Sequence, residues 1–162
     1  MARDPEKIQT DRLTLRGINE TDAPEIVEWR SDPDVYRYFK SPHKITVREH
    51  FHWYNNSYLF NEDRLDWMCI EKATGKKIGV FGLVREGSVA EVNYLLAPDA
   101  RHKGYAGESI DRIIRYAREK WRPEKIVAEI HRDNAPSIAL AERLGFVPEA
   151  ARGDFVLYGI GG

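Results

Sequence analysis

The sequence predicts one mixed α/β domain built around a single sheet. Apolar stretches joined by tight turns predict a three-stranded antiparallel meander, at residues 66–72, 77–85 and 89–97. A helical stretch from Glu108 then leads into a buried-type strand at 125–130, which predicts a strand–helix–strand crossover. A further helix and a last strand, expected at 136–144 and 155–160, complete the order of a mixed sheet.

The composition fits a globular protein of ordinary size. The chain has 162 residues, 42% hydrophobic and 31% charged, with a formal net charge of −1. This balance argues against a general nucleic-acid or membrane-surface binder, and no apolar run approaches the roughly 20 residues of a membrane span. Cys69 is the single cysteine, so we expect neither an internal disulfide nor a cysteine-based metal site. We expect one domain over residues 1–162, without a signal peptide, in the cytoplasm, as a monomer or homodimer.

The N-terminal part alternates between short strand and helix signals. Residues 10–16 predict a first strand, and 21–29 a short helix capped by Asn19 or Thr21. Pro33 is well placed to restart a helical turn through residue 39. A capping box at Thr46-x-x-Glu49 predicts a helix to about residue 60. Its expected apolar face consists of Val47, Phe51, Tyr54 and Tyr58.

The C-terminal elements have clear boundaries. Turns at Thr74-Gly75 and at residues 86–88 separate the strands of the meander. The helix after Glu108 carries apolar residues at helical spacing, namely Ile110, Ile113, Ile114, Ala117 and Trp121. Gly145 stops the helix at 136–144.

The loop between the strand at 89–97 and the following helix predicts an anion site. It runs Arg101-His102-Lys103-Gly104-Tyr105-Ala106-Gly107. Free backbone N–H groups and the positive end of the helix dipole meet at such a turn, which suits a phosphate or pyrophosphate. The small residues allow close approach and the basic residues add charge. The alternative is an ordinary capped turn with two solvated basic side chains.

Four motifs in order resemble the GNAT superfamily of N-acetyltransferases. Arg101-x-x-Gly104-x-Ala106 is similar to the acyl-CoA loop of that family. The other three are the opening at residues 10–16, Leu96-Ala97-Pro98, and Asn134-x-x-Ser137 continuing to Leu144-Gly145-Phe146. The resemblance implies a GNAT fold, with a mostly antiparallel sheet, splayed central strands at 89–97 and 125–130, and helices on both faces.

The resemblance implies acetyl-CoA as the acetyl donor and no metal. Its pyrophosphate would rest on the amides of residues 102–107, and its pantetheine arm would lie between the splayed strands. A backbone N–H around Tyr94 to Leu96 would stabilise the oxyanion. The cofactor-binding residues so implied are Leu95, Leu96, Arg101, His102, Lys103, Gly104, Tyr105, Ala106, Gly107, Asn134 and Ser137.

The catalytic residues that the resemblance implies are Glu91 and Ser137. Glu91 would be the base for the acceptor amine, with a solvent-facing strand carboxylate as the alternative. The tyrosine that many relatives place seven residues after the motif asparagine is Ala141 here, so Ser137 is the expected partner of the departing thiolate. A capping role is the alternative for Asn134, and a backbone-bonded helix hydroxyl for Ser137. Cys69 lies in a core strand, so direct transfer is expected rather than an acetyl-cysteine.

The N-terminal region is expected to form the acceptor cleft. Ten of the eighteen aromatic residues fall between Trp29 and Trp67. Around Trp29-Arg30 and Glu49–Trp53 the sequence resembles the branch of ribosomal-protein and nucleotide-amino-sugar acetyltransferases, so Trp29, Arg30 and Trp53 are the expected acceptor contacts. Arg30, Arg37 or His50 could meet a diphosphate, whereas core packing is the alternative for the aromatic residues. His50 and His52, two apart on a helix, do not share a face, so no metal is expected there.

The expected function is acetyl transfer to a nucleotide-linked amino sugar or another small amine. The N-terminal α-amine of a protein, as in ribosomal-protein acetylation, is the second candidate acceptor. A non-catalytic acyl-CoA-binding module is the alternative of a different class. Neither nucleic acid nor a membrane is expected as a partner.

Overall fold

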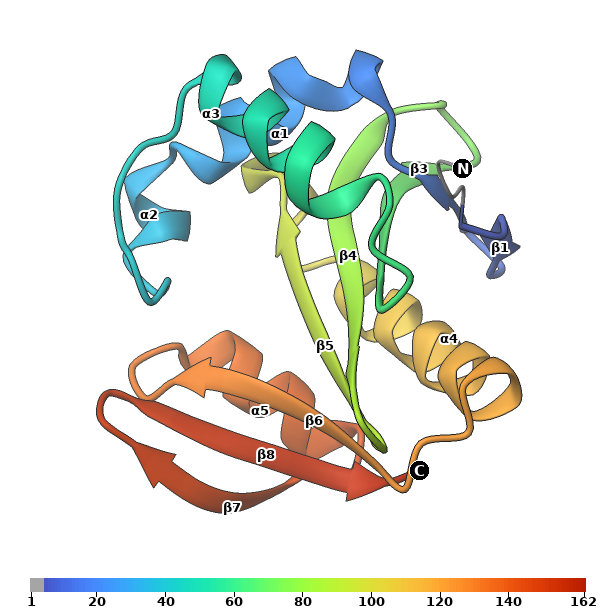
Figure 1. The fold of residues 1–162 in the computed structure, drawn as a ribbon, viewed down its shortest axis with the longest axis vertical. Coiled ribbons are helices and arrows are strands. Elements are labelled where there is room, and N and C mark those ends of the chain that lie inside the picture. The colour runs from blue at the N-terminus through green and yellow to red at the C-terminus, as the bar shows by residue number, and fades with distance from the viewer. Residues whose placement is uncertain (1–4) are drawn as a thin grey trace.

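The computed structural model describes residues 5–162, which form one eight-stranded sheet with helices on both faces (Figure 1). The strands, in the sheet order β1-β2-β3-β4-β5-β6-β8-β7, are β1 (Ile8–Gln9), β2 (Leu13–Gly17), β3 (Arg64–Glu71), β4 (Lys77–Glu86), β5 (Val89–Leu96), β6 (Lys125–His131), β8 (Phe155–Gly161) and β7 (Val147–Arg152). The α-helices are α1 (Ala23–Arg30), α2 (Pro33–Tyr36), α3 (Val47–Trp53), α4 (Tyr105–Lys120) and α5 (Ala135–Arg143). Short 3₁₀ turns η1 (Glu20–Asp22) and η3 (Pro98–Ala100) and a π-helical turn η2 (Tyr54–Tyr58) complete the elements.

The sheet divides where β5 meets β6. These two strands are parallel, whereas all other neighbouring strands are antiparallel. β5 and β6 pair over only three positions, from Val89 with Lys125 to Glu91 with Val127. Beyond Glu91 they diverge, and Figure 1 shows β6 and β8 turning away from β4 and β5. The predicted splayed pair is therefore confirmed, and the open edge of β5 lies in the middle of the sheet.

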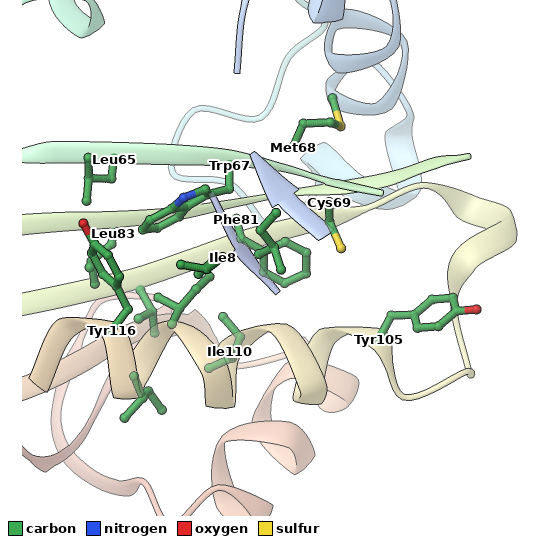
Figure 2. Packing of buried hydrophobic residues seen from close by; sticks show 14 of the residues in the cluster. Ile8, Leu65, Trp67, Met68, Cys69, Phe81, Leu83, Tyr105, Ile110 and Tyr116 are labelled. Atoms are coloured by element: carbon green, nitrogen blue, oxygen red, sulfur yellow. The ribbon is translucent and has the colours of Figure 1, made fainter. Parts of the chain in front are cut away.

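One face of the sheet packs against the amphipathic helix α4. Ile110, Ile113 and Ala117 of α4 are at most 3% exposed. Figure 2 shows Ile110 and Tyr116 of α4 directed at the strands that carry Trp67 and Phe81, which are fully buried. The Tyr116 ring meets Trp67 edge-on, with ring centroids 5.3 Å apart. Burying each large apolar side chain stabilises the fold by about 1.5–3 kcal/mol, so this layer fixes the position at which α4 begins.

The opposite face is covered by α1 and α3, the helices that enclose the pocket described below. The capping box predicted at Thr46 is present at the start of α3. Of the two candidate caps at Asn19 and Thr21, Asn19 forms a capping box, but it caps the 3₁₀ turn η1 that precedes α1. The helix expected to reach residue 60 changes to a π-helical turn after Trp53. The expected apolar face is therefore only half correct. Tyr54 and Tyr58 are buried, but Val47 is 46% exposed.

Two strands were not predicted. β7 has six exposed residues, because it is the last strand of the sheet and packs no face against the core. Its sequence therefore lacks the apolar alternation by which a half-buried strand is recognised. β1 has only two residues. Within residues 5–162, no helix is both long and apolar enough to cross a membrane.

Candidate functional site

The loop before α4 presents a row of unbonded backbone N–H groups. Within the described chain, the first helical bond runs from Glu108 N to Gly104 O, and no bond is found from the amides of residues 102–107. Gly104 has φ +79°, and His102 also has a positive φ of 65°. These two left-handed residues turn successive amides toward one side, as in anion-binding nests. These features are compatible with the anion site predicted from the sequence, which stays a prediction.

A side-chain network braces this loop from behind. Arg12 donates from Nη1 to Lys103 O at 2.9 Å and from Nε to Glu108 Oε1 at 2.8 Å. The guanidinium also lies 4.5 Å from the centre of the Tyr105 ring, whose hydroxyl bonds to Glu71. The Tyr105 side chain is thus part of the brace, and only its backbone amide faces the anion site. This role of Arg12 could not be predicted from the sequence, because its partners lie 91 and 96 residues away.

The second element of the site is a pair of hydroxyl groups in the gap between β5 and α5. The Tyr94 hydroxyl and Ser137 Oγ lie 2.9 Å apart. Asn134 caps α5, accepting from Ser137 N at 3.4 Å, so its capping role is present. The Tyr94 ring stacks on Phe81 at 5.5 Å. Burial raises the pKa of Tyr94, and the hydrogen bond to Ser137 partly opposes that rise.

Position 141 lies in the core rather than in the gap. Ala141 is 5% exposed. The hydroxyl beside Ser137 comes instead from Tyr94 on β5, 43 residues earlier in the chain. A tyrosine hydroxyl is therefore present, but it comes from a strand, where no sequence motif marks it as a hydroxyl donor.

Glu91 lies where β5 and β6 begin to diverge. Burial raises the pKa of Glu91, and the carboxylate of Glu129 on β6 raises it further. Lys40 pairs with Glu129 at 3.0 Å and partly opposes the rise. Glu91 is half-buried on the same strand face as Asn93, and it is not among the residues that line the pocket described below. A carboxylate with a raised pKa is a stronger base, as general base catalysis requires.

Leu95 and Leu96 lie on the part of β5 that pairs only with β4. β6 no longer pairs with β5 here, so one edge of this segment is free of strand partners within residues 5–162. Such an edge can bond an extended chain as an added strand would.

A pocket of about 180 Å³ lies between α1, α3 and strands β3–β5. Its apolar lining includes Ile18, Ile26, Phe39, Val80 and Leu95. Its polar and aromatic lining includes Arg30, His50, Trp53, Arg64, Asp66 and Asn93, with Tyr94 reaching it from the gap. The pocket therefore opens onto the same residues of β5 at which acetyl transfer is expected.

The predicted acceptor contacts are only partly brought together. Arg30 and Trp53 line the pocket, as does His50. Trp29 does not, because it is 7% exposed and packs in the core below α1. Its role as an acceptor contact is therefore not supported. Arg37 is exposed and also lies outside the pocket.

Charged groups in the pocket are unevenly paired. Arg64 holds Asp66 with both arms of its guanidinium, Nε to Oδ2 at 2.6 Å and Nη2 to Oδ1 at 3.1 Å. Arg30 has no ion pair with a described residue, and its Nε lacks a hydrogen-bond partner there. His50 is 3% exposed with Nδ1 unpartnered, and burial, followed by the charge of Arg30, lowers its pKa.

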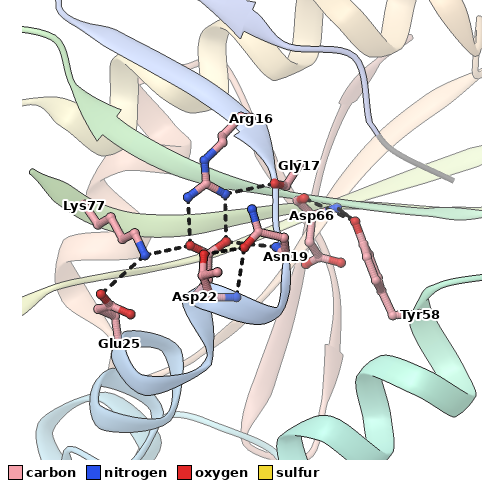
Figure 3. Close-up of polar contacts among 9 residues, drawn as sticks. Arg16, Gly17, Asn19, Asp22, Glu25, Tyr58, Asp66 and Lys77 are labelled. Carbon is pink, nitrogen blue, oxygen red and sulfur yellow. Dashed lines mark hydrogen bonds and ion pairs between the residues drawn. The ribbon is translucent and has the colours of Figure 1, made fainter. Parts of the chain in front are cut away.

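A buried carboxylate fixes the chain that leads into α1. Asp22 is fully buried and accepts from both guanidinium arms of Arg16 at 2.8 Å (Figure 3). It also pairs with Lys77 of β4 at 2.8 Å and accepts from Asn19 N at 2.9 Å. Burial works to raise the pKa of Asp22, but the bonds from Arg16, Lys77 and Asn19 outweigh burial and hold the pKa below its usual value. This cluster anchors the helix that carries Arg30 to the sheet.

The single cysteine, a possible nucleophile, lies in the core of the protein. Cys69 is fully buried beside Ser109, and burial raises the pKa of its thiol to about 12. A thiol with that pKa and no exposure does not act as a nucleophile near neutral pH. Among residues 5–162, no group of three or more His, Cys, Asp or Glu side chains is placed to hold a metal ion.

Comparison with known proteins agrees with this geometry. The model of the acetyltransferase (GNAT) domain family matches residues 12–147. The N-acetyltransferase p20 of Bacillus licheniformis is 30% identical over 156 residues, covering 93% of this chain and 87% of that protein. Spermidine N(1)-acetyltransferase of Vibrio cholerae is 27% identical over 142 residues, covering 85% and 80%. The crystal structure of spermidine N-acetyltransferase from Vibrio cholerae with CoA and spermine superposes with a TM-score of 0.83 at 22% identity, covering 93% of this chain and 96% of that one.

Proposed function

Because this chain belongs to the GNAT family of acetyltransferases and is thereby an acetyl-CoA-dependent N-acetyltransferase, we propose that its acceptor is a small primary amine held in the pocket between α1, α3 and β5. The observation that carries this proposal is that the pocket opens onto Asn93, Tyr94 and Leu95. These residues lie on the segment of β5 that has lost its β6 partner.

The donor site consists of the loop and the open edge of β5. The amides of residues 102–107 would hold the pyrophosphate of acetyl-CoA, with Arg101 and Lys103 adding charge. The pantetheine arm would bond the open edge near Leu95 and Leu96 and carry the acetyl group toward Tyr94. Asn134, at the start of α5, faces the same gap from the other side.

The transfer is proposed to be direct. The neutral amine nitrogen attacks the acetyl carbonyl and passes one proton to Glu91, which later releases it to solvent, while backbone N–H groups of β5 stabilise the oxyanion. The C–S bond then breaks, and the thiolate takes a proton from the Tyr94 hydroxyl. Ser137, hydrogen-bonded to that hydroxyl, supports the tyrosinate until solvent restores the proton. Glu91 thus acts on the amine and Tyr94 on the departing thiolate, and both residues lie on β5.

The size of the pocket favours a small acceptor. Small-molecule sites commonly enclose about 300–1,000 Å³, and this pocket encloses about 180 Å³. A small amine fits within this volume, whereas a nucleotide-linked amino sugar would have to extend out of the pocket. The relative that carries the name spermidine N(1)-acetyltransferase also acts, by that name, on a small amine.

Thiol release from acetyl-CoA tests the proposal. The panel consists of small primary amines, a UDP-linked amino sugar and peptides that start with Ala or Ser. We expect release with small amines, and Glu91→Gln to lower turnover while CoA still binds. Thiol release with peptide only would indicate that the protein acetylates the N-termini of proteins. Thiol release with the UDP-sugar only would show that the pocket is not the whole acceptor site. CoA binding without release by any amine would indicate a binding module.

A further inference from the structure

The charges inside the acceptor pocket define a chemical class of acceptor. Besides Tyr94, four side chains that can carry a charge near neutral pH line it, namely Arg30, His50, Arg64 and Asp66. Asp66 is the only carboxylate among the described lining residues, and Arg64 occupies both of its oxygens. Asp66 is 3% exposed and its charge is already paired with Arg64, so it is a poor partner for a second cationic group of an acceptor.

Arg30 has no ion-pair partner among the described residues. Within residues 5–162 it forms no salt bridge with a carboxylate, and its Nε has no hydrogen-bond acceptor. Its pKa is lowered by burial and, next, by the charge of Arg64, while the charge of Asp66 only partly opposes that fall. An unpaired guanidinium beside a like charge is costly to keep in a partly buried site, and an anion there would remove that cost.

A second polar side chain in the pocket also has an atom without a hydrogen-bond partner among the described residues. His50 is 3% exposed, lines the pocket and has an unpartnered Nδ1. Phe39 lies 5.4 Å from the Arg30 guanidinium, and Trp53 lies 5.1 Å from that of Arg64. The aromatic rings hold both guanidinium groups in place, so the cationic end of the pocket is ordered before an acceptor arrives.

We propose that the acceptor is a small primary amine that also carries a carboxylate or phosphate group, with the anionic group held at Arg30 and the amine directed toward β5. This inference rests on the proposed function. A guanidinium recognises either anion through planar, charge-assisted hydrogen bonds. A polyamine is disfavoured, because its second ammonium group would meet Arg30 and Arg64 and would find no free carboxylate.

Matched pairs of amines test the proposal. Thiol release is measured for alanine against alaninamide, for glucosamine 6-phosphate against glucosamine, and for spermidine. In at least one pair we expect kcat/KM for the anionic member to be about tenfold higher or more, which corresponds to one charge-assisted hydrogen bond. The two pairs distinguish a carboxylate from a phosphate acceptor.

Variants assign the preference to Arg30. Arg30→Gln should reduce the preference to about threefold or less, and Arg30→Lys should keep part of it because the charge remains. Arg37→Gln is the matched control, because it removes a nearby exposed arginine outside the pocket and should keep the preference. Spermidine or the neutral amines reacting equally well, or an unchanged preference in Arg30→Gln, would overturn the inference and leave the proposed function standing.

A binding measurement separates failure of the inference from failure of the function. The protein is saturated with CoA so that the loop before α4 is occupied, and its melting temperature is then followed while propionate or inorganic phosphate is added. Stabilisation of the parent protein and of Arg37→Gln, but not of Arg30→Gln, supports the anion site even if no amine reacts. Equal stabilisation of the parent and Arg30→Gln, or none in either, refutes it.

Discussion

Replacing Tyr94 by Phe removes one oxygen atom from the centre of the proposed mechanism. The ring stacks on Phe81 at 5.5 Å, and a phenylalanine keeps that contact. The change deletes the hydroxyl that lies 2.9 Å from Ser137 Oγ. Because Ser137 retains some contact with solvent, we expect a loss of only about 1 kcal/mol in the free energy of unfolding.

The effect on catalysis should be far larger. Loss of a general acid costs about 10²–10⁴-fold, so Tyr94→Phe should lower kcat by that factor. The KM for acetyl-CoA and the Kd for CoA should change little, because the hydroxyl acts on the departing thiolate. Initial rates of thiol release at saturating amine give kcat, and calorimetry gives the Kd for CoA.

Ser137→Ala provides the matched control. It leaves the tyrosine in place but removes its partner, so it should lower kcat by a smaller factor than Tyr94→Phe. A kcat of Tyr94→Phe within about threefold of the parent would refute the assignment of Tyr94 as the acid. A larger loss in Ser137→Ala than in Tyr94→Phe would instead place the serine next to the thiolate.

Three further changes have defined outcomes. Gly104→Glu should abolish CoA binding in calorimetry, because it places a negative charge at the predicted pyrophosphate site. Gly104→Ala shares the strain of the left-handed φ of +79° but adds no charge, so it should still bind CoA. Loss of CoA binding in both variants would show that backbone strain, and not charge, explains the effect. Glu129→Gln should lower the pKa of Glu91, and the acidic limb of kcat/KM against pH should move to lower pH; an unmoved limb would exclude Glu91 as the base. Asp22→Asn should lower the free energy of unfolding by about 2–4 kcal/mol at neutral pH, measured in urea. Because the folded pKa of Asp22 is depressed, the parent should lose this stability only as the pH falls below the ordinary carboxyl range, and a difference of less than about 1 kcal/mol would contradict the role of the cluster.

The sequence was sufficient for elements whose signals are local. The capping box at Thr46 depends on residues three apart, and it forms as predicted. The meander and α4 follow from apolar periodicity and are confirmed in order. The loop that starts α4 could be predicted because its function depends on backbone N–H groups, which need only a turn and a helix start.

The rest depends on contacts between distant parts of the chain. Tyr94 meets Ser137 across 43 residues, and only the divergence of β5 and β6 makes room for that contact. Arg64 and Asp66 pair locally on β3, but it is the packing of α1 on the sheet that brings Arg30 into the same pocket without an ion-pair partner of its own among the described residues. Trp29 is an example of an acceptor contact that was wrongly predicted from sequence position. It is next to the pocket residue Arg30 in the chain, but its own side chain packs in the core.

Identification of the acetylated product tests the central claim most directly. The protein is incubated with acetyl-CoA and a mixture of small amines, UDP-linked amino sugar and peptide, and the products are identified by mass spectrometry. The structure predicts an N-acetylated small amine, formed by the parent protein and strongly reduced in Tyr94→Phe. Acetylated peptide or UDP-sugar as the sole product, or equal product from the parent and Tyr94→Phe, would contradict the account.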